Sequence, residues 1–320
     1  MSSQKSAVLL AVHFEGERQQ ESFPQAFTDR KVIDLNDGSD HPGVFHGVKY
    51  AVVWKPSAEL FSRLPDLEVI FSAGAGVDHI LQQPHLPDLP VVRFVDETLT
   101  TRMSEWVCLQ CLMHLRQQRK YDTAQKQRVW FGHPQPEAKE ITVGIMGMGV
   151  LGQDAARKLK TLGFNVIGWS RTPKQIDGVM CYDASGLDVF LEQTHFLVGL
   201  LPFTKDTAGI FHRGLFKKLK RHDEIASPIL INAGRGGSQI EDDIIAALED
   251  GTLGGVSLDV FESEPLSTNS KLWGFEQAII TPHIAANSDV TAIGYHVHRQ
   301  IERYERGDAL EHLVDQSKGY

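Results

Sequence analysis

Short apolar runs alternate with helix-like segments along most of the chain. In the first hundred residues the apolar runs have the length of buried strands, and a segment such as Ser57–Leu64 has the pattern of a short helix. This alternation predicts a parallel sheet with helices on both of its faces. The strands that we expect in this part are Val8–Phe14, Val32–Leu35, Tyr50–Trp54, Val69–Phe71 and Val91–Val95.

A second alternating series begins after a long helix, predicted for Thr100–Gln127, and a turn-rich passage at 131–136. Its six expected strands and their crossover helices fit a doubly wound dinucleotide-binding fold. A last helix, Asp289–Arg306, has no strand after it, so we expect it to pack on the first domain. The strands of this series are Thr142–Met146, Asn165–Trp169, Phe196–Leu200, Pro228–Asn232, Gly255–Val260 and Ala278–Thr281.

The pattern as a whole predicts an α/β protein with two doubly wound parallel-sheet domains. Residues 1–104 and 287–320 form a discontinuous, flavodoxin-like domain in this interpretation, and residues 105–286 form a Rossmann domain. The chain of 320 residues is long enough for two domains that each bury a core. Its content of 42% hydrophobic and 23% charged residues is typical of a globular protein.

Composition argues against several classes of function. A net charge of −9 disfavours a nucleic-acid-binding protein, which needs clustered Lys and Arg. The longest early apolar run, Ala7–Phe14, is too short to span a membrane. Three cysteines are too few for a disulfide framework and favour a reducing compartment, so we expect a cytoplasmic protein. Cys108 and Cys111 form a C-x-x-C among apolar helical residues, and we interpret them as core residues rather than a redox pair.

A glycine-rich loop opens the second series. Gly147, Gly149 and Gly152 form a G-x-G-x-x-G pattern between an apolar strand and a helix expected at Gln153–Leu162. Glycines at these positions permit a tight turn, close approach of a pyrophosphate, and close packing of the strand on the helix. The N-terminus of the helix then faces the phosphates. The loop therefore predicts a dinucleotide site.

The turn after the next strand predicts the type of dinucleotide. An enzyme that prefers NAD usually has Asp or Glu at this point, where it binds the ribose 2′-hydroxyl. Here the position is Ser170, followed by Arg171, and a guanidinium can bind a 2′-phosphate through paired hydrogen bonds. Thr172 and Lys174 could assist it. We therefore expect NADPH as the cofactor, with NADH accepted less well.

Three polar residues each follow a strand of the second series. Arg235 stands among glycines in N-A-G-R-G-G, Glu264 lies in D-V-F-E-S-E-P-L, and His283 lies in T-P-H. Ligands bind beyond the carboxyl ends of the strands in such sheets, so we expect these side chains to converge. A glycine-flanked Arg suits a carboxylate, because bidentate pairing needs room. A His beside a Glu suits general acid catalysis, because the carboxylate stabilises the imidazolium.

At these residues the sequence resembles the D-isomer-specific 2-hydroxyacid dehydrogenase family. The resemblance covers nearly the whole chain and includes the three polar residues in the family's order. Within the family the chain is most similar to the NADPH-using branch that reduces glyoxylate and hydroxypyruvate. The Ser170-Arg171-Thr172 turn and the ending Lys318-Gly319-Tyr320 support this placement. The resemblance implies a small 2-keto acid as substrate and makes the first domain the substrate domain.

The resemblance also implies roles for individual residues. His283 would protonate the carbonyl oxygen of the substrate as the hydride arrives, and Glu264 would orient and charge His283. Arg235 would bind the substrate carboxylate and polarise the keto oxygen. Asp259 would contact the nicotinamide carboxamide. The full set of cofactor-binding residues would be Gly147, Gly149, Val150, Leu151, Gly152, Ser170, Arg171, Thr172, Leu201, Pro202, Ala233, Gly234 and Asp259.

The first domain would contribute its own residues to substrate binding. Ala75, Gly76 and Val77 resemble the family loop whose N–H groups grip the substrate carboxylate as a small anion nest. Trp54 resembles an aromatic wall that keeps the pocket small, and Met103 would flank the nicotinamide. Core packing is the alternative interpretation for both Trp54 and Met103.

Other functions remain open at this point. The family resembles corepressors that keep the dehydrogenase fold, so a cofactor-sensing interaction protein is the alternative from another class. A related phosphoglycerate or formate dehydrogenase is a third possibility. We expect no metal site, since His296 and His298 are two residues apart on a predicted helix and point to different faces. The resemblance implies a homodimer, and we expect neither a nucleic acid nor a membrane as partner.

Overall fold

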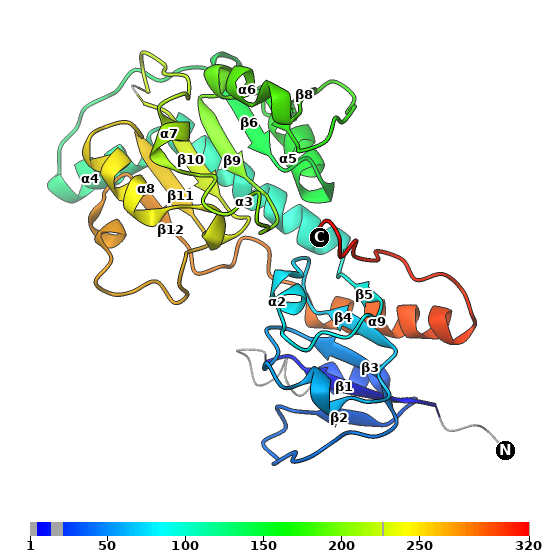
Figure 1. Ribbon diagram of the computed structural model, residues 1–320. Coiled ribbons are helices and arrows are strands. Elements are labelled where there is room, and N and C mark those ends of the chain that lie inside the picture. The colour runs from blue at the N-terminus through cyan, green and yellow to red at the C-terminus, as the bar shows by residue number, and fades with distance from the viewer. Residues whose placement is uncertain (1–4, 14–21, 226, 320) are drawn as a thin grey trace. The chain divides into compact units, whose positions relative to one another are not determined.

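The chain divides into two compact units, which we call the first and the second domain (Figure 1). The computed structural model describes residues 5–13, 22–225 and 227–319. The first domain comprises Met1–Leu99 and Ser288–Tyr320, and the second comprises Thr100–Asn287. The limits expected from the sequence lie a few residues from these. Phe14, the last residue of the first expected strand, and Tyr320 lie outside the described residues.

Five parallel strands form the sheet of the first domain: β1 (Ala7–Ala11), β2 (Val32–Asp34), β3 (Val48–Val53), β4 (Val69–Ser72) and β5 (Val91–Val92). Their order is β2-β1-β3-β4-β5. This is the strand order of flavodoxin-like folds, so the expected class is confirmed. The central strands are nearly continuous buried runs, as in parallel sheets covered on both faces.

Seven parallel strands form the sheet of the second domain: β6 (Thr142–Met146), β7 (Asn165–Trp169), β8 (Met180–Tyr182), β9 (Phe196–Gly199), β10 (Ile229–Asn232), β11 (Gly255–Leu258) and β12 (Ala278–Ile280). Their order is β12-β11-β10-β9-β6-β7-β8, so it reverses between β6 and β9. In doubly wound sheets a dinucleotide binds at such a reversal, beyond the carboxyl ends of the strands. The expected Rossmann fold is therefore confirmed.

The strand that the sequence pattern did not predict is β8, so the sheet has seven strands rather than six. It lies at the edge of the sheet and pairs with β7. All three of its residues are at least partly exposed. Residues 179–182 form a short apolar run, but β8 is a partly exposed edge strand and lacks the burial on both faces that is typical of the central strands.

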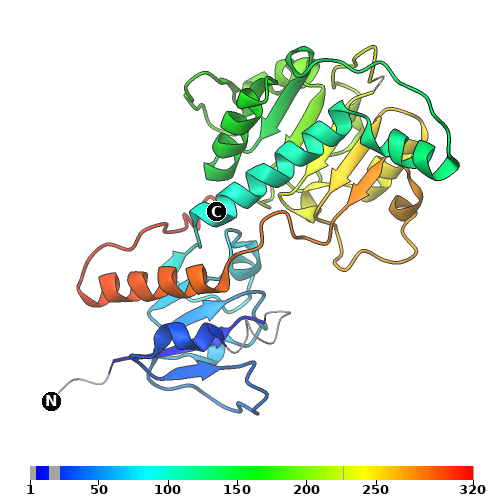
Figure 2. The same cartoon turned by 180° about the vertical axis from the view of Figure 1, so that it is seen from behind.

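Helices cover both faces of the second sheet. α3 (Glu97–Leu115) and α5 (Val150–Thr161) pack apolar residues on one face, and Figure 2 shows α3 lying along it. α6 (Leu187–Gln193), α7 (Arg213–Phe216) and α8 (Glu241–Glu249) pack on the other. Within the described ranges, no helix combines the length and apolarity needed to cross a membrane. The other helical segments are α4 (Gln118–Gln127), η3 (Ala138–Glu140), η4 (Ala184–Gly186), η5 (Gly236–Ser238) and η6 (Lys271–Gly274).

The helix predicted for Ser57–Leu64 is wrong. This segment forms a turn and a short 3-10 helix, η2 (Phe61–Arg63). Pro65 disfavours helical backbone at Leu64, whose φ and ψ are −120° and 68°. The stretch between Pro56 and Pro65 is also too short to stabilise an α-helix by itself.

The single long helix predicted for Thr100–Gln127 is two helices, α3 and α4. Gln117 separates them, because its backbone is left-handed, with φ 52° and ψ 38°. The Gln117 side chain stabilises the break. Its Nε2 donates to the carbonyl oxygen of Pro134 at 2.6 Å, and its Oε1 accepts from Lys120 Nζ at 2.5 Å. Neither a glycine nor a proline marks this position, so helix propensity alone did not predict the break.

The last helix, α9 (Val290–Glu305), belongs to the first domain, as its lack of a following strand predicted. It packs closely against η1 (Phe23–Phe27). A Cβ added to Gly294 would lie only 2.5 Å from the Cβ of Ala26, so the glycine permits this approach. The chain thus returns to the first domain after completing the second sheet.

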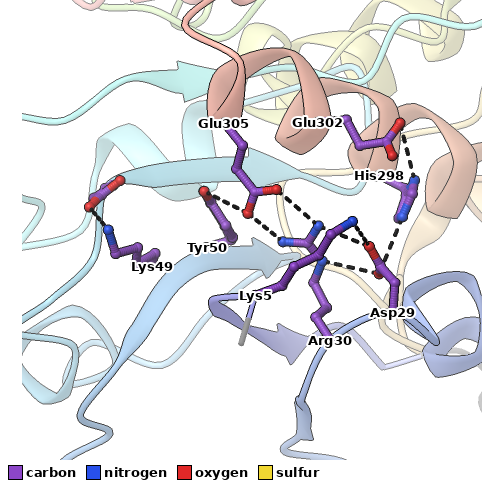
Figure 3. Close-up of polar contacts among 9 residues, drawn as sticks. Lys5, Asp29, Arg30, Lys49, Tyr50, His298, Glu302 and Glu305 are labelled. Atoms are coloured by element: carbon purple, nitrogen blue, oxygen red, sulfur yellow. Dashed lines mark hydrogen bonds and ion pairs between the residues drawn. The ribbon is translucent and has the colours of Figure 1, made fainter. Parts of the chain in front are cut away.

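An ionic network around a buried arginine also attaches α9 to the rest of the first domain (Figure 3). The Arg30 side chain is fully buried and donates to Glu305 of α9 at 2.9 Å and to Asp29 at 3.2 Å. Tyr50 of β3 donates to Glu305 at 3.3 Å. Burial raises the pKa of the Asp29 carboxyl, but hydrogen bonds from Lys5 and Arg30 outweigh it and hold that pKa well below its usual range. The network therefore links α9 to β3 and to the segment before β2 through one buried guanidinium.

Candidate active site

Loops that follow parallel strands meet at one edge of the second sheet, and their backbones touch at glycines. A Cβ added to Gly147, after β6, would lie 2.4 Å from the carbonyl oxygen of Leu200, after β9. A Cβ added to Gly234, after β10, would lie 2.8 Å from the carbonyl oxygen of Leu201. Larger residues would push the loops apart. The glycines therefore allow these loops to lie in contact at the edge of the sheet where the strand order reverses.

Each glycine of the G-x-G-x-x-G loop has a separate role. Gly147 has a φ of 109°, which favours glycine. A Cβ on Gly152 would lie 2.0 Å from the carbonyl oxygen of Gly147, so this residue lets α5 pack on the end of β6. A Cβ on Gly149 would meet no atom within 4 Å, so the space in front of it is open. Crowding at the first and third glycines and open space at the second fit a dinucleotide pyrophosphate.

α5 begins directly after Gly149, with Val150 and Leu151 in its first turn. The first N–H groups of a helix have no carbonyl partner within the helix and favour an anion. Val150 is exposed, so this end of α5 is open to a ligand. The predicted phosphate-binding residues therefore lie together, at the start of one helix.

Lys174, in the turn after β7, contacts the glycine loop. Its Nζ donates to the carbonyl oxygen of Met148 at 2.8 Å. Nε2 of Gln153 donates to the same oxygen at 3.2 Å. Lys174 thus supports the glycine loop, and its assistance to Arg171 stays a prediction.

The turn after β7 carries the predicted 2′-phosphate site. Ser170 is buried, and its hydroxyl donates to the carbonyl oxygen of Thr172 at 2.7 Å, which closes the turn. Nη1 of Arg171 donates to Asp206, in the loop after β9, at 3.1 Å. Asp206 was not predicted as a site residue, because nothing in the sequence places these two loops side by side.

The loops after β9 and β10 contain the other predicted cofactor residues. Leu201 is buried, and the carbonyl oxygen of Pro202 accepts a hydrogen bond from the Thr207 hydroxyl at 2.7 Å. The Thr207 hydroxyl also accepts from the N–H of Thr204 at 2.8 Å. Ala233 is buried where β10 ends. The Thr207 contacts order the loop after β9 at the carboxyl edge of the sheet.

A buried amide pair shapes the loop that carries Arg235. Nδ2 of Asn232 donates to Oε1 of Gln239 at 2.8 Å, and both residues are buried. The same Nδ2 donates to the carbonyl oxygen of Arg235 at 3.3 Å, and the N–H of Gly234 donates to Oδ1 of Asn232 at 3.1 Å. Nε2 of Gln239 donates to the carbonyl oxygen of Val260 at 3.0 Å. Asn232 and Gln239 thus position Arg235, and the sequence motifs did not identify this role.

Gly236 brings the Arg235 loop against the loop after β11. A Cβ on Gly236 would lie 1.8 Å from the carbonyl oxygen of Phe261. The preceding Arg235 has extended backbone, with φ −144° and ψ 140°. Its side chain is partly buried, and its Nη1 donates to the carbonyl oxygen of Gly234 at 2.7 Å. The close contact at Gly236 therefore fixes the position of the main chain from which the Arg235 side chain extends.

His283 and Glu264, which the sequence predicts to be an acid–base pair, lie within hydrogen-bond distance of each other. Nδ1 of His283 lies 2.9 Å from Oε2 and 3.1 Å from Oε1 of Glu264. The side chains are 35% and 25% exposed, so the pair is reachable from solvent but partly shielded. The N–H of Phe261 donates to Oε1 of Glu264 at 3.3 Å and helps to orient the carboxylate. Because Nδ1 faces Glu264, Nε2 is the ring nitrogen that can serve a ligand.

A buried carboxylate holds the turn that carries His283. Oδ1 of Asp259 accepts from the N–H of Ile284 at 2.9 Å and from the Thr281 hydroxyl at 2.5 Å, and Oδ2 accepts from the N–H of Ala285 at 2.9 Å. His283 has a φ of 55°, a strained conformation for a residue with a side chain. Such strain costs about 1–3 kcal/mol. Asp259 therefore stabilises the His283 conformation, a role beyond the cofactor contact implied by the resemblance.

The loop after β4 contains the residues of the first domain that were predicted to bind a carboxylate. Ser72 is buried, and its hydroxyl donates to the carbonyl oxygen of Gly76 at 3.0 Å, which closes the loop. Among the described residues, the N–H groups of Ala75, Gly76 and Val77 have no hydrogen-bond acceptor. α2 (Asp78–Leu81) begins directly after them. Successive backbone N–H groups of this kind suit an anion.

Trp54 directly follows β3 and packs against two residues of the first domain. Its ring lies edge-to-face with that of His79, with 4.3 Å between centroids. A Cβ on Gly74 would lie 2.4 Å from Cζ3 of Trp54, so the glycine leaves room for the indole. The indole is thus held from two sides while only partly buried. Its role as a pocket wall stays a prediction.

Met103, Cys108 and Cys111 are core residues of the second domain. All three are buried in one apolar cluster, so core packing is confirmed for Met103 and for the C-x-x-C segment. Burial raises the pKa of the Cys108 thiol to about 11 and that of Cys111 well above its usual value, so neither is a reactive thiolate. Across the part of the chain that the structure describes, no three His, Cys, Asp or Glu residues are grouped as metal ligands.

The chain is similar to known proteins over most of its length. Residues 108–285 match the family model described as D-isomer specific 2-hydroxyacid dehydrogenase, NAD binding domain. The chain is 38% identical over 278 residues to glyoxylate/hydroxypyruvate reductase A of Yersinia enterocolitica. That match covers 85% of this chain and 87% of the relative.

Two solved structures are similar to the whole chain. One is the NADPH-dependent glyoxylate/hydroxypyruvate reductase from Sinorhizobium meliloti in complex with NADP and sulfate. It has a TM-score of 0.96 and 57% identity, with 99% of this chain and 100% of that chain covered. The other, from Rhizobium etli CFN 42, is named a probable 2-hydroxyacid dehydrogenase and is in complex with NADP, HEPES and L(+)-tartaric acid. It has a TM-score of 0.93 and 54% identity, with 99% and 100% covered.

We expect Gly236→Ala to lower the free energy of unfolding by about 2 kcal/mol or more, because the new Cβ would overlap the Phe261 carbonyl and force the two loops apart. Urea denaturation measures this change. Gly274→Ala in η6 is the matched control, since a Cβ there meets no atom within 4 Å. Equal stabilities of the two variants would show that the close contact at Gly236 is not essential.

Proposed function

The chain belongs to the D-isomer-specific 2-hydroxyacid dehydrogenase family, and we propose that it reduces a small 2-keto acid to the 2-hydroxy acid with NADPH. Glyoxylate, hydroxypyruvate and similar acids are the proposed substrates, since similar proteins are named for the first two. The observation that carries the proposal is the His283–Glu264 pair, with 2.9 Å between Nδ1 and Oε2. It lies at the sheet edge that also carries the glycine loop and Arg235.

In this proposal residues 105–286 bind the dinucleotide, and residues 1–104 and 287–320 form the substrate domain. NADPH supplies the hydride when bound. The glycine loop and the start of α5 hold its pyrophosphate, and Arg171 recognises its 2′-phosphate. NADH is accepted less well, because it lacks that phosphate. The remaining cofactor contacts are assigned to Ser170, Thr172, Leu201, Pro202, Ala233, Gly234 and Asp259.

Residues of both domains are assigned to the substrate. In the second domain, the Arg235 guanidinium binds the substrate carboxylate and polarises the keto oxygen. In the first domain, the N–H groups of the loop at Ala75, Gly76 and Val77 bind a carboxylate as an anion nest. Trp54 limits the size of the acid that fits.

His283 delivers the proton in the proposed reaction. Nδ1 faces the Glu264 carboxylate, so Nε2 holds the proton that passes to the carbonyl oxygen. The carbonyl carbon gains a hydride, its oxygen gains this proton, and the keto group becomes a hydroxyl. Glu264 acts through His283, because its negative charge stabilises the protonated ring and its two oxygens set the ring's orientation.

The proposal predicts that the purified chain oxidises NADPH when glyoxylate or hydroxypyruvate is added. We expect His283→Ala to lower kcat about 100-fold or more, since it removes the proton donor. His46→Ala is the matched control, because the His46 side chain is 80% exposed and belongs to no proposed site. Absorbance at the NADPH band measures both variants with a panel of 2-keto acids.

Two outcomes of this assay would contradict the proposal. Wild-type rates no higher than those of His283→Ala across the whole panel would rule out the proposed chemistry. Tight NADPH binding without turnover of any keto acid would instead favour a cofactor-sensing interaction protein.

We also propose that the chain forms a homodimer and acts in the cytoplasm. Val129, Trp130 and Phe131 are exposed in succession after α4, and Trp130 is 102% exposed. An exposed aromatic run of this kind suits burial against a second copy. The cysteines are free thiols, which agrees with a reducing compartment.

Sedimentation velocity tests the proposed dimer. We expect wild-type chain to sediment as a dimer and Trp130→Ser to raise the dissociation constant about tenfold or more, because large aromatic residues dominate interface energies. Trp273→Ser is the matched control, since Trp273 is 55% exposed and its indole N–H donates within the same loop, to Ser267. A monomeric wild-type chain, or equal association of both variants, would refute the dimer or the role of Trp130 in it.

A further inference from the structure

A carboxylate stands beside the cation that we assign to the cofactor's 2′-phosphate. Nη1 of Arg171 donates to Oδ2 of Asp206 at 3.1 Å. The Arg171 side chain is 39% exposed and the Asp206 side chain is 68% exposed, so a ligand from solvent can reach both. The two residues come from the loops after β7 and β9, and their ion pair joins these loops.

The Asp206 carboxylate is presented by an ordered turn. The Thr207 hydroxyl donates to the carbonyl oxygen of Pro202 at 2.7 Å and accepts from the N–H of Thr204 at 2.8 Å. Asp206 lies inside this turn, so its main chain is held in place while its side chain reaches Arg171. The pairing is therefore a consequence of the loop's own structure.

The other cation of the turn after β7 is engaged elsewhere. Lys174 donates to the carbonyl oxygen of Met148 in the glycine loop at 2.8 Å. Arg171 is therefore the cation of this turn to which we assign the 2′-phosphate. The Asp206 carboxylate partly neutralises that guanidinium.

We infer that Asp206 is a specificity-determining residue that lowers the preference of this chain for NADPH over NADH. The inference rests on the proposed function, because it takes Arg171 as the group that binds the 2′-phosphate. A phosphate must either displace Asp206 from Arg171 or share the guanidinium with it. Displacement breaks an ion pair, and sharing brings the phosphate close to a carboxylate of the same charge. Both routes weaken binding of the phosphate, whereas the 2′-hydroxyl of NADH meets neither penalty.

Equilibrium binding of two small probes to the full chain tests this inference. Adenosine 2′,5′-bisphosphate carries the 2′-phosphate, and 5′-AMP lacks it. Asp206→Asn removes the charge but keeps the size, and we expect it to lower the Kd of the bisphosphate about three- to tenfold. The Kd of 5′-AMP is expected to stay the same, which also shows that the variant is folded. Isothermal titration calorimetry measures both.

Asp188→Asn is the matched control. The Asp188 side chain is 63% exposed and pairs with Lys218 at 2.6 Å, so the variant loses the same charge at similar exposure without breaking the Arg171 pair. We expect it to leave both Kd values unchanged. In an Arg171→Ala background, Asp206→Asn is expected to have little effect on the bisphosphate, because its influence acts through the guanidinium.

An unchanged or higher Kd of the bisphosphate in Asp206→Asn overturns the inference. An equal decrease in Asp188→Asn, or an undiminished effect in the Arg171→Ala background, overturns it as well. Wild-type chain that binds both probes equally would overturn the proposed cofactor preference together with this inference. A bisphosphate preference that Asp206→Asn leaves unchanged overturns the inference alone.

Discussion

Backbone contact between loops at the carboxyl edge of the second sheet is the constraint on which the candidate site depends. All strands of that sheet are parallel, so each loop that follows a strand emerges at the same edge. Loops far apart in the sequence reach contact there because Gly147, Gly234 and Gly236 have no side chain in the way. The glycines set the spacing of the loops, and the polar residues between them supply the chemistry.

Buried polar side chains hold the two proposed catalytic residues, His283 and Arg235, in position. Asp259 holds the strained turn of His283, and the pair of Asn232 and Gln239 holds the loop of Arg235. All three supporting residues are buried and hydrogen-bonded, and satisfied buried networks of this kind rigidify a site. The groups that they position are partly exposed and can meet a ligand. The candidate site therefore contains two kinds of residue. Buried residues hold the loops in place, and partly exposed residues are available to a ligand.

Apolar runs predicted both sheets because parallel strands are buried on both faces. The same signal is weak at the exposed edge strand β8 and says nothing of the left-handed Gln117 that divides α3 from α4. The glycine loop and the order of Arg, Glu and His identified the candidate catalytic residues from sequence alone. Contacts between residues far apart in the sequence could not be predicted: Gln239, which helps to position Arg235, bonds to Val260, and Arg171 of the cofactor site pairs with Asp206. Such partners follow from how loops meet in space, which residue spacing does not encode.

Deuterium transfer tests the proposed hydride step most directly. The wild-type chain is mixed with glyoxylate and NADPH that carries deuterium at both C4 positions of the nicotinamide, and the hydroxy acid formed is analysed by mass spectrometry and NMR. Direct hydride transfer to the keto carbon predicts one deuterium at C2 of the product for each NADPH consumed. Consumption of NADPH without a hydroxy acid, or a product without deuterium at C2, would contradict the proposed reaction.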